Sequence, residues 1–130
     1  MKTVVLCGSG KFKPEMRKFG SDLKKLGVVV YEPYLHRAKE GEWEALSSEY
    51  QKFICLGLTH DHFHKIRMAD VVFIFNKDGY IGNSTTLEIG YATALGKPIY
   101  SLEPDAAEGC RDCLFRDNIK TAKELVEFLK

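Results

Sequence analysis

The sequence predicts a single-domain α/β protein, a Rossmann-like or flavodoxin-like three-layer sandwich around a five-stranded parallel sheet of order 2-1-3-4-5. Three observations lead to this fold. Short unbroken apolar runs, typical of strands buried on both faces, end at loops rich in glycine, proline or polar residues. These runs alternate with helical periodicity, and right-handed crossovers then place helices on both faces of the sheet. Finally, 130 residues that are 45% hydrophobic suit one domain over residues 1–130 with a single core.

The first strand is predicted over residues 3–7, where a continuous apolar run stops at Gly8-Ser9-Gly10. Pro14 suits the first turn of the helix that follows, and Gly27 ends that helix. The apolar face of this helix is expected to consist of Met16, Phe19, Leu23 and Leu26. Residues 28–31 then form the second predicted strand, which Glu32 and Pro33 close.

The middle of the chain predicts a long helix after a polar excursion. Residues 34–44 are polar and are expected to be irregular or a short helix. Residues 46–68 have helical periodicity, with a bend expected near Gly57 because glycine weakens helix interiors. Its apolar residues are Tyr50, Phe53, Ile54, Leu58, Phe63 and Ile66.

The last third predicts three further strands and two helices. The third strand is residues 71–75, and the helix after it ends at Gly96. The apolar side of that helix is expected to carry Leu87, Tyr91, Ala94 and Leu95. Residues 98–102 form a fourth strand with proline at its first position, and residues 114–115 form a short fifth. Thr121 and Glu124 have the spacing of a capping box at the start of the final helix.

Charge and composition exclude several classes of partner. The chain has 19 basic and 18 acidic residues and a net charge of +1, so we expect neither a nucleic-acid polymer nor a membrane as partner. The apolar run at the N-terminus is too short for a signal peptide, and no window is long enough to span a membrane. We therefore expect a cytoplasmic protein with four reduced cysteines.

The segment from residue 76 to residue 98 is the most informative candidate site. Glycines, hydroxyls and the carboxylate of Glu88 follow a buried strand there, and ligands of open parallel sheets bind outside the carboxyl ends of strands. Glycines allow close approach, and the polar and aromatic side chains supply contacts. The substrate-binding candidates are Asn76, Asp78, Gly79, Tyr80, Gly82, Asn83 and Ser84.

A second candidate loop follows the first strand. Backbone N–H groups and lysines there could surround a phosphate, although an ordinary turn with solvated lysines is the alternative. The residues are Gly8, Ser9, Gly10, Lys11 and Phe12. Lys13 stands where a dinucleotide fingerprint needs its third glycine, so no cofactor is expected. In the order 2-1-3-4-5 this loop and the 76–88 loop meet at one crevice.

Glu88 has two readings from the residues alone. Thr85 and Glu88 have capping-box spacing, so the carboxylate could satisfy the start of a helix. Alternatively, a carboxylate in such a loop could attack an electrophilic carbon, such as the anomeric carbon of a nucleoside, to form a covalent glycosyl intermediate.

The histidines at 60, 62 and 64 suggest acid–base chemistry more than metal binding. His60 and His64 share a helix face that His62 does not, and Asp61 stands where an HExxH motif has glutamate. Cys110 and Cys113 lack the second ligand pair of a zinc site. We expect no metal, and one histidine near the crevice could act as an acid or base.

Three stretches resemble the nucleoside 2-deoxyribosyltransferase superfamily, which includes deoxynucleoside-monophosphate N-glycosidases. They are Cys7-Gly8-Ser9, then KIRMAD at residues 65–70, and LEIGYATALGKPI at residues 87–99. The resemblance implies retaining cleavage or transfer of the bond between base and sugar, with Glu88 as nucleophile. It implies that Ser9 holds the sugar or its 5′-phosphate, and that the protein assembles as a homodimer or larger homo-oligomer. The implied partner is a small nucleoside or nucleotide.

Two positions depart from the family pattern. The family commonly has an aspartate, which helps to protonate the leaving base, eight residues before the position of Asp70; here that residue is His62, next to Asp61. A second acid of the transferase branch, six residues before the glutamate, is Gly82 here. The resemblance therefore implies His62 or Asp61 as the acid, action on a different base, or nucleotide binding without cleavage.

Overall fold

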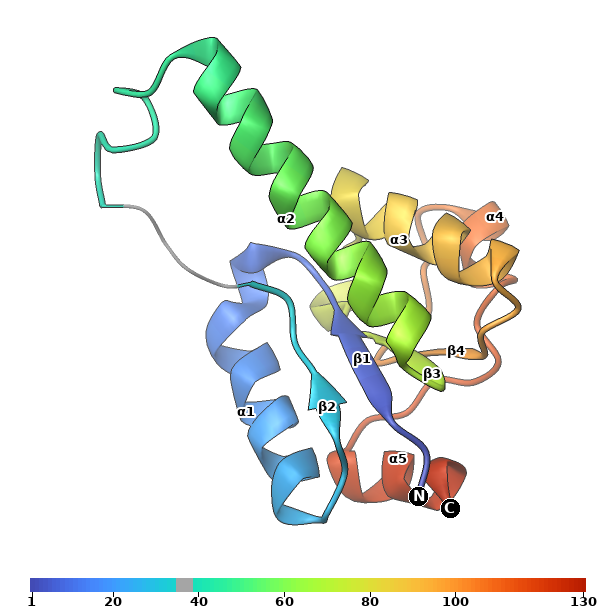
Figure 1. Ribbon diagram of the computed structural model, residues 1–130. Helices are drawn as coiled ribbons and strands as arrows, with labels where there is room; N and C mark the ends of the chain where they lie inside the picture. The colour runs from blue at the N-terminus through green and yellow to red at the C-terminus, as the bar shows by residue number, and fades with distance from the viewer. Residues whose placement is uncertain (35–38) are drawn as a thin grey trace.

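The computed structural model describes residues 1–34 and 39–130, which contain a four-stranded parallel sheet (Figure 1). The strands are β1 (Val4–Cys7), β2 (Val30–Tyr31), β3 (Val71–Ile74) and β4 (Ile99–Ser101). Their order is β2-β1-β3-β4, and β1 pairs along its whole length with β3, from Val4 opposite Val71 to Cys7 opposite Ile74. The predicted positions of the first four strands relative to one another are confirmed, as is the α/β class.

The predicted fifth strand is wrong. Beyond β4, the chain forms the short helix α4 (Gly109–Asp112) and then returns beside β4, where Ser101 and Asn118 make one isolated parallel bridge. The side chains of Leu114 and Phe115 are instead partly buried, and they pack against the apolar cluster that contains Val5 and Cys7. Their apolar character reflects this packing, and a single bridge does not make a strand.

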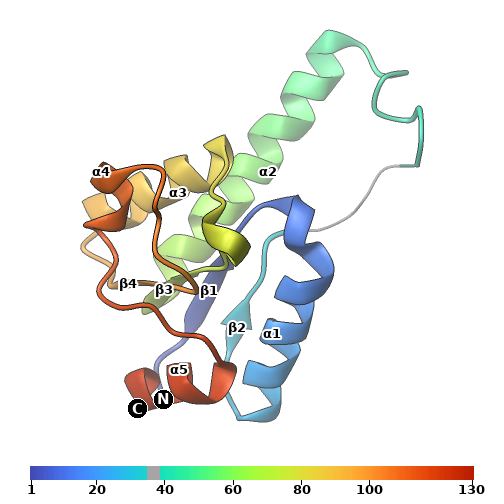
Figure 2. The same cartoon turned by 180° about the vertical axis from the view of Figure 1, so that it is seen from behind.

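Helices cover both faces of the sheet, as the sequence predicts (Figure 2). One face carries α1 (Lys13–Lys25) and α5 (Ala122–Leu129), while the other carries α2 (Ser48–Met68) and α3 (Asn83–Ala94). Two short 3-10 helices, η1 (Gly10–Phe12) and η2 (Lys77–Gly79), follow β1 and β3. Alternate residues of the strands feed two apolar clusters: Val4 and Leu6 face α1 and α5, whereas Val5 and Cys7 face α2 and α3.

Local signals locate several helix ends correctly. Pro14 lies in the first turn of α1, and Gly27 has φ +87°, a left-handed conformation that suits glycine just after a helix. At α5, the Thr121 side chain accepts from the backbone N–H of Glu124 at 3.1 Å, so the predicted cap is confirmed. These signals depend on neighbouring residues only, which is why the sequence reveals them.

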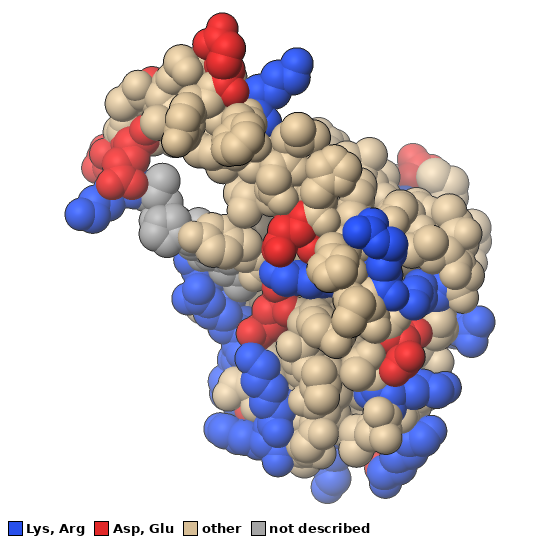
Figure 3. Space-filling view, in the orientation of Figure 1, with Lys and Arg blue, Asp and Glu red and all other residues tan. Residues whose placement is uncertain are grey.

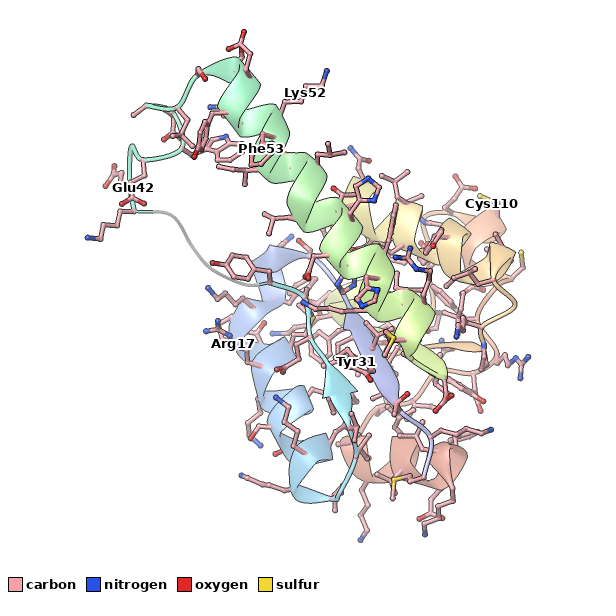
Figure 4. All side chains as sticks on the ribbon, viewed as in Figure 1. Arg17, Tyr31, Glu42, Lys52, Phe53 and Cys110 are labelled. Carbon is pink, nitrogen blue, oxygen red and sulfur yellow. The ribbon has the colours of Figure 1, made fainter. Side chains whose placement is uncertain are left out.

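Helix α2 is unbroken through Gly57, and half of it projects beyond the sheet (Figure 1). Phe53 and Lys52 lie on this projecting half (Figure 4), and its large apolar side chains are exposed: Tyr50, Phe53, Leu56 and Leu58. In α2 only His62 and Ile66 are buried. The long helix is confirmed, but the bend expected near Gly57 is wrong, because the helix continues through that residue. The large apolar side chains of the projecting half stay exposed because that part of α2 extends past the elements that could cover it.

The buried face of α3 also differs from the predicted one. Thr85, Ile89 and Ala92 are buried, whereas Leu87 and Leu95 are exposed. Helix α3 packs against β4 and against the neighbouring helix α2, and that position turns a stripe of small and branched residues inward. The helix is apolar on more than one side, so its sequence pattern does not define the rotation.

The termini lie side by side (Figure 1), where the N–H of Lys2 donates to the carbonyl of Leu129 at 2.8 Å. On the face shown in Figure 3, basic side chains predominate over the lower body, and acidic side chains gather toward the end of the projecting part. None of the helices in the described ranges is both long and apolar enough to cross a membrane. The polar stretch over residues 34–44 is only partly described. Residues 35–38 lie outside the described residues, and residues 40–45 form turns.

Candidate functional site

Three side chains from three different elements meet above the carboxyl end of the sheet. Cys7 is the last residue of β1, His62 lies on α2, and Glu88 lies on α3. The Cys7 Sγ is 3.2 Å from His62 Nε2, and the same nitrogen is 3.3 Å from Glu88 Oε2. Cys7 is fully buried, His62 is 5% exposed and the Glu88 side chain is 13% exposed. A single imidazole nitrogen therefore contacts both a thiol and a carboxyl group.

Two members of this cluster, His62 and Glu88, form part of the wall of a pocket of about 250 Å³, and Cys7 lies behind them. The pocket lies at the switch point between β1 and β3, where the chain turns to opposite sides of the sheet. It brings together Gly8 and Gly10 from the first loop with Ser84 and Glu88 from the second. The other lining residues are Pro33, Tyr34, Leu58, Thr59, His62, Phe63 and Leu87. A site of this size suits a small polar molecule better than a polymer.

Glu88 does not cap α3. That helix begins at Asn83, its N-cap is Gly82, and no side chain caps it, so Glu88 lies beyond the first turn. Thr85 Oγ1 is buried with no hydrogen-bond partner among the described residues. The capping-box alternative is therefore wrong, and the carboxyl group is directed to the pocket and His62 instead.

Burial keeps both members of the Glu88–His62 pair neutral near pH 7. Desolvation raises the pKa of Glu88 to about 8. Desolvation, reinforced by the positive charge of Lys65 and partly opposed by Asp61, lowers the pKa of His62 to about 4. Burial also raises the pKa of the Cys7 thiol, and Glu88 adds to that effect. Between about pH 4 and about pH 8 the carboxyl–imidazole pair thus holds one proton, which either group can carry.

Position 8 requires glycine because the chain just after β1 lies very close to the chain just after β3. A Cβ at this position would lie 2.8 Å from the carbonyl oxygen of Phe75 and 3.2 Å from the Met16 sulfur. Next to it, the Ser9 side chain accepts from the N–H of Lys11 at 3.2 Å and caps η1. The loop is therefore held by its own contacts, with Gly8 and Gly10 lining the pocket.

Lys11, Phe12 and Tyr80 form a cluster that joins the two loops. The Lys11 ammonium lies 4.3 Å from the centre of the Tyr80 ring, a cation–π distance. Phe12 meets Tyr80 edge-on at 6.0 Å but is only 5% exposed, so it belongs to the core and presents little surface to a ligand. Of these two rings, Tyr80 offers the stacking surface, because it is 45% exposed.

The remaining candidates of the 76–84 segment shape the loop. Asn76 donates through its side chain to the carbonyl of Glu103 at 2.8 Å and accepts from the N–H groups of Leu102 and Glu103. Asp78 and Gly79 have positive φ angles of 57° and 77°, which make the tight turn of η2. Gly82 precedes α3, Asn83 is exposed in its first turn, and neither lines the pocket.

Of the two predicted acids, the structure brings only His62 to Glu88. The exposed Asp61 pairs with Lys65 at 2.6 Å on the outer side of α2, and His60 and His64 are exposed as well. Sequence reasoning missed Cys7 as a site residue, because a cysteine in an apolar strand resembles an ordinary core residue. The signal that could have found it is its place as the last strand residue before the glycine loop.

Comparison with known proteins agrees with this architecture. The sequence model of the nucleoside 2-deoxyribosyltransferase family matches residues 4–119. The structure resembles a 2-deoxyribosyltransferase from Bacillus psychrosaccharolyticus, with a TM-score of 0.64 and 19% identity over 95% of this chain and 89% of that one. It also resembles a conserved protein from Enterococcus faecalis V583, with a TM-score of 0.62 and 16% identity over 98% of this chain and 96% of that one. No curated protein matches the sequence significantly. Because the family match covers most of its length, the chain belongs to the nucleoside 2-deoxyribosyltransferase family.

Proposed function

We propose that the protein cleaves or transfers the N-glycosidic bond of a nucleoside or nucleoside 5′-monophosphate through a covalent glycosyl–Glu88 intermediate. The observation that carries this proposal is the 3.3 Å contact between Glu88 Oε2 and His62 Nε2 in the wall of the pocket. It joins a potential nucleophile to a group that can accept and return its proton.

The pair supplies both halves of the first step. Glu88 passes its proton to His62 Nε2, and the resulting carboxylate attacks the anomeric carbon. The new oxygen–carbon bond forms as the carbon–nitrogen bond to the base breaks, and the departing base takes the bonding electron pair. His62 then donates the same proton to the base, so no outside proton is consumed. This role for His62 explains how the site works without the family's usual aspartate.

The second step releases the sugar. Water, or a second base, attacks the anomeric carbon of the glycosyl ester from the opposite face, while His62 accepts the proton of the incoming group. The carbon–oxygen bond to Glu88 breaks, and the proton returns to the pair. Two displacements at the same carbon retain its configuration. Water gives a hydrolase and a base gives a transferase.

Substrate contacts are assigned from the pocket and from the neighbouring pair Lys11 and Tyr80, which lies outside the pocket lining. The sugar lies beside Gly8, Gly10 and Ser84, where the glycines leave room for it. The base stacks on an aromatic surface, for which Tyr80 is the candidate. A 5′-phosphate would find the positive charge of Lys11 next to that ring. Asp61, on the outer side of α2, has no part in this scheme.

We also propose that the chain forms a homodimer or larger homo-oligomer, as the family resemblance implies. The exposed apolar side chains on the projecting half of α2, among them Tyr50, Phe53 and Leu56, give a second copy a surface to bury. Light scattering coupled to size-exclusion chromatography measures the mass directly. A chain that remains monomeric at micromolar concentration contradicts this part of the proposal.

The direct test is a panel of ribo- and deoxyribonucleosides and their 5′-monophosphates, incubated with and without an added acceptor base. Chromatography then measures free base and exchanged nucleoside. We expect base release by the wild type, loss of it in Glu88→Ala, and near wild-type rates in the matched control Glu127→Gln, whose side chain is 65% exposed on α5 and outside the pocket. Saturable nucleotide binding without base release would overturn the proposal in favour of a non-catalytic nucleotide-binding module.

A further inference from the structure

The buried cluster also carries the donor atoms of a metal site. Cys7, His62 and Glu88 each offer one ligand atom, and these atoms all lie within 4.8 Å of one another. A thiolate, an imidazole and a carboxylate are the three protein ligands that Zn²⁺ takes most readily. The sequence does not reveal this cluster, because Cys7, His62 and Glu88 come from three separate elements. The histidines with metal-like spacing in the sequence are His60 and His64.

Two of the three donor pairs have nearly the spacing of tetrahedral coordination, and the third, Cys7 Sγ and the Glu88 carboxyl oxygen, lies within 4.8 Å. With zinc bonds of about 2.0 to 2.3 Å, two ligand atoms of one tetrahedron lie about 3.3 to 3.6 Å apart. The observed separations are 3.2 Å from Cys7 Sγ to His62 Nε2 and 3.3 Å from that nitrogen to Glu88 Oε2. Small side-chain shifts are enough to place all three atoms around one ion.

Position and charge favour an ion here. The cluster lies in and behind the pocket wall that includes His62 and Glu88, which leaves a path for entry and a fourth coordination position for water. A thiolate and a carboxylate together supply two negative charges, so the complex with a divalent cation is neutral. A neutral complex avoids the cost of isolated charges in a buried site.

We propose that Cys7, His62 and Glu88 form a three-ligand site for Zn²⁺. The Cys7 thiol and the protonated Glu88 carboxyl group each release one proton to solvent as the sulfur–metal and oxygen–metal bonds form. The thiolate and imidazole select zinc or cobalt over magnesium and calcium, which prefer oxygen ligands. One consequence rests also on the proposed function: metal binding and glycosyl transfer exclude each other. The metal occupies the Glu88 oxygen and the His62 nitrogen that the reaction needs.

The test is a titration of the full chain with Co²⁺ in the absence of nucleotide. Tetrahedral cobalt bound by a thiolate gives visible d–d bands and a near-ultraviolet sulfur-to-cobalt charge-transfer band. We expect saturation at one equivalent and displacement by one equivalent of Zn²⁺. Cys7→Ser should abolish the charge-transfer band. Glu88→Gln should weaken cobalt binding by at least about 10- to 100-fold, the loss typical of a residue that only orients a ligand, because it removes a direct ligand. Circular dichroism verifies that both variants are folded.

The matched control is Cys110→Ser combined with Cys113→Ser. Both cysteines are exposed and outside the cluster, and Cys110 lies on α4 away from α2 (Figure 4). We expect this variant to keep the full spectrum. A wild-type chain without the charge-transfer band, or a band that survives in Cys7→Ser and disappears in the control, overturns the zinc site.

The zinc site and the proposed reaction fail independently. Cobalt binding is measured without substrate, so it stands even if no nucleotide releases base. Where base is released, Zn²⁺ should suppress it and a chelator should restore it. Tight metal binding at the cluster with unchanged base release would instead show that Glu88 is not the reacting group.

Discussion

His62 Nε2 lies 3.3 Å from Glu88 Oε2 and 3.2 Å from Cys7 Sγ, so one nitrogen links the strand β1 to the helix α3. In the buried pair, the carboxyl pKa of about 8 lies above the imidazole pKa of about 4. This reverses the order found in water, where histidine holds its proton to higher pH than glutamate. The predictions on pH, on the acid and on stability follow from that reversal.

The rate of base release should have a bell-shaped pH dependence. Below about pH 4 the pair gains a second proton, and His62 can no longer accept the proton of Glu88. Above about pH 8 the pair loses its only proton, and none remains for the departing base. Measuring kcat/KM from below pH 4 to above pH 8 should therefore give two limbs near these values. A rate that keeps rising through pH 8 would contradict the proton transfer from Glu88 to the base.

Substitution of His62 should separate the acid role from the shape of the pocket. His62→Asn cannot donate or accept the proton, so base release should fall about 10²- to 10⁴-fold. His62→Asp restores the aspartate that is common in the family, and it should recover part of that loss with an altered pH profile. Kinetics of both variants on the same substrate are the measurement. A His62→Asn variant that releases base at the wild-type rate would show that His62 has no acid–base role.

Glu88→Gln should stabilise the fold in alkaline solution. The folded pKa is raised from 4.5 to about 8, so the folded protein holds a proton that the unfolded chain has lost between these values. Stability therefore falls as the pH rises through that window, by on the order of 3 to 5 kcal/mol in total. Glutamine removes this loss. Urea unfolding above pH 8 should show the gain, and unfolding near pH 4.5 should show little difference.

A matched control for that comparison is Glu127→Gln. The Glu127 side chain is 65% exposed and pairs with the exposed ammonium of Lys130, so its replacement should change stability by less than about 1 kcal/mol at either pH. If both variants gain the same stability above pH 8, the buried position of Glu88 is not the cause.

Gly8→Ala should destabilise the protein much more than Gly10→Ala. The new Cβ at position 8 would lie 2.8 Å from the backbone carbonyl of Phe75, which cannot move without distorting the sheet. A Cβ at position 10 meets nothing within 4 Å. We expect a loss of about 1 to 3 kcal/mol for the first variant, measured by urea unfolding. Equal stability of the two variants would contradict the close packing of the β1 end against Phe75.

Much of the fold follows from local sequence patterns. The buried strands at residues 4–7 and 71–74 read as continuous apolar runs, and the ends of α1 and α5 carry proline, glycine and threonine signals. The crossover rule then orders four strands correctly and places the two glycine-containing loops at one switch point. These features depend on short stretches and on general rules of chain connection.

Patterns failed where packing between distant elements decides the outcome. The apolar pair at 114–115 packs as side chains and forms no strand, and α3 turns a different stripe inward from the one expected. The apolar residues in the first half of α2 stay exposed, because that half extends beyond the sheet. Hydrophobicity shows that a residue can be buried, but not which neighbour will cover it.

The sequence alone was enough to identify the α/β class, the family resemblance and Glu88 as the carboxylate of interest. Tertiary structure decided that Glu88 is a pocket residue and not a helix cap, and that its partners are His62 and Cys7. The reason is physical: periodicity defines elements along the chain, whereas contacts between a strand end and two helices depend on how those helices cross the sheet and how each is rotated about its axis.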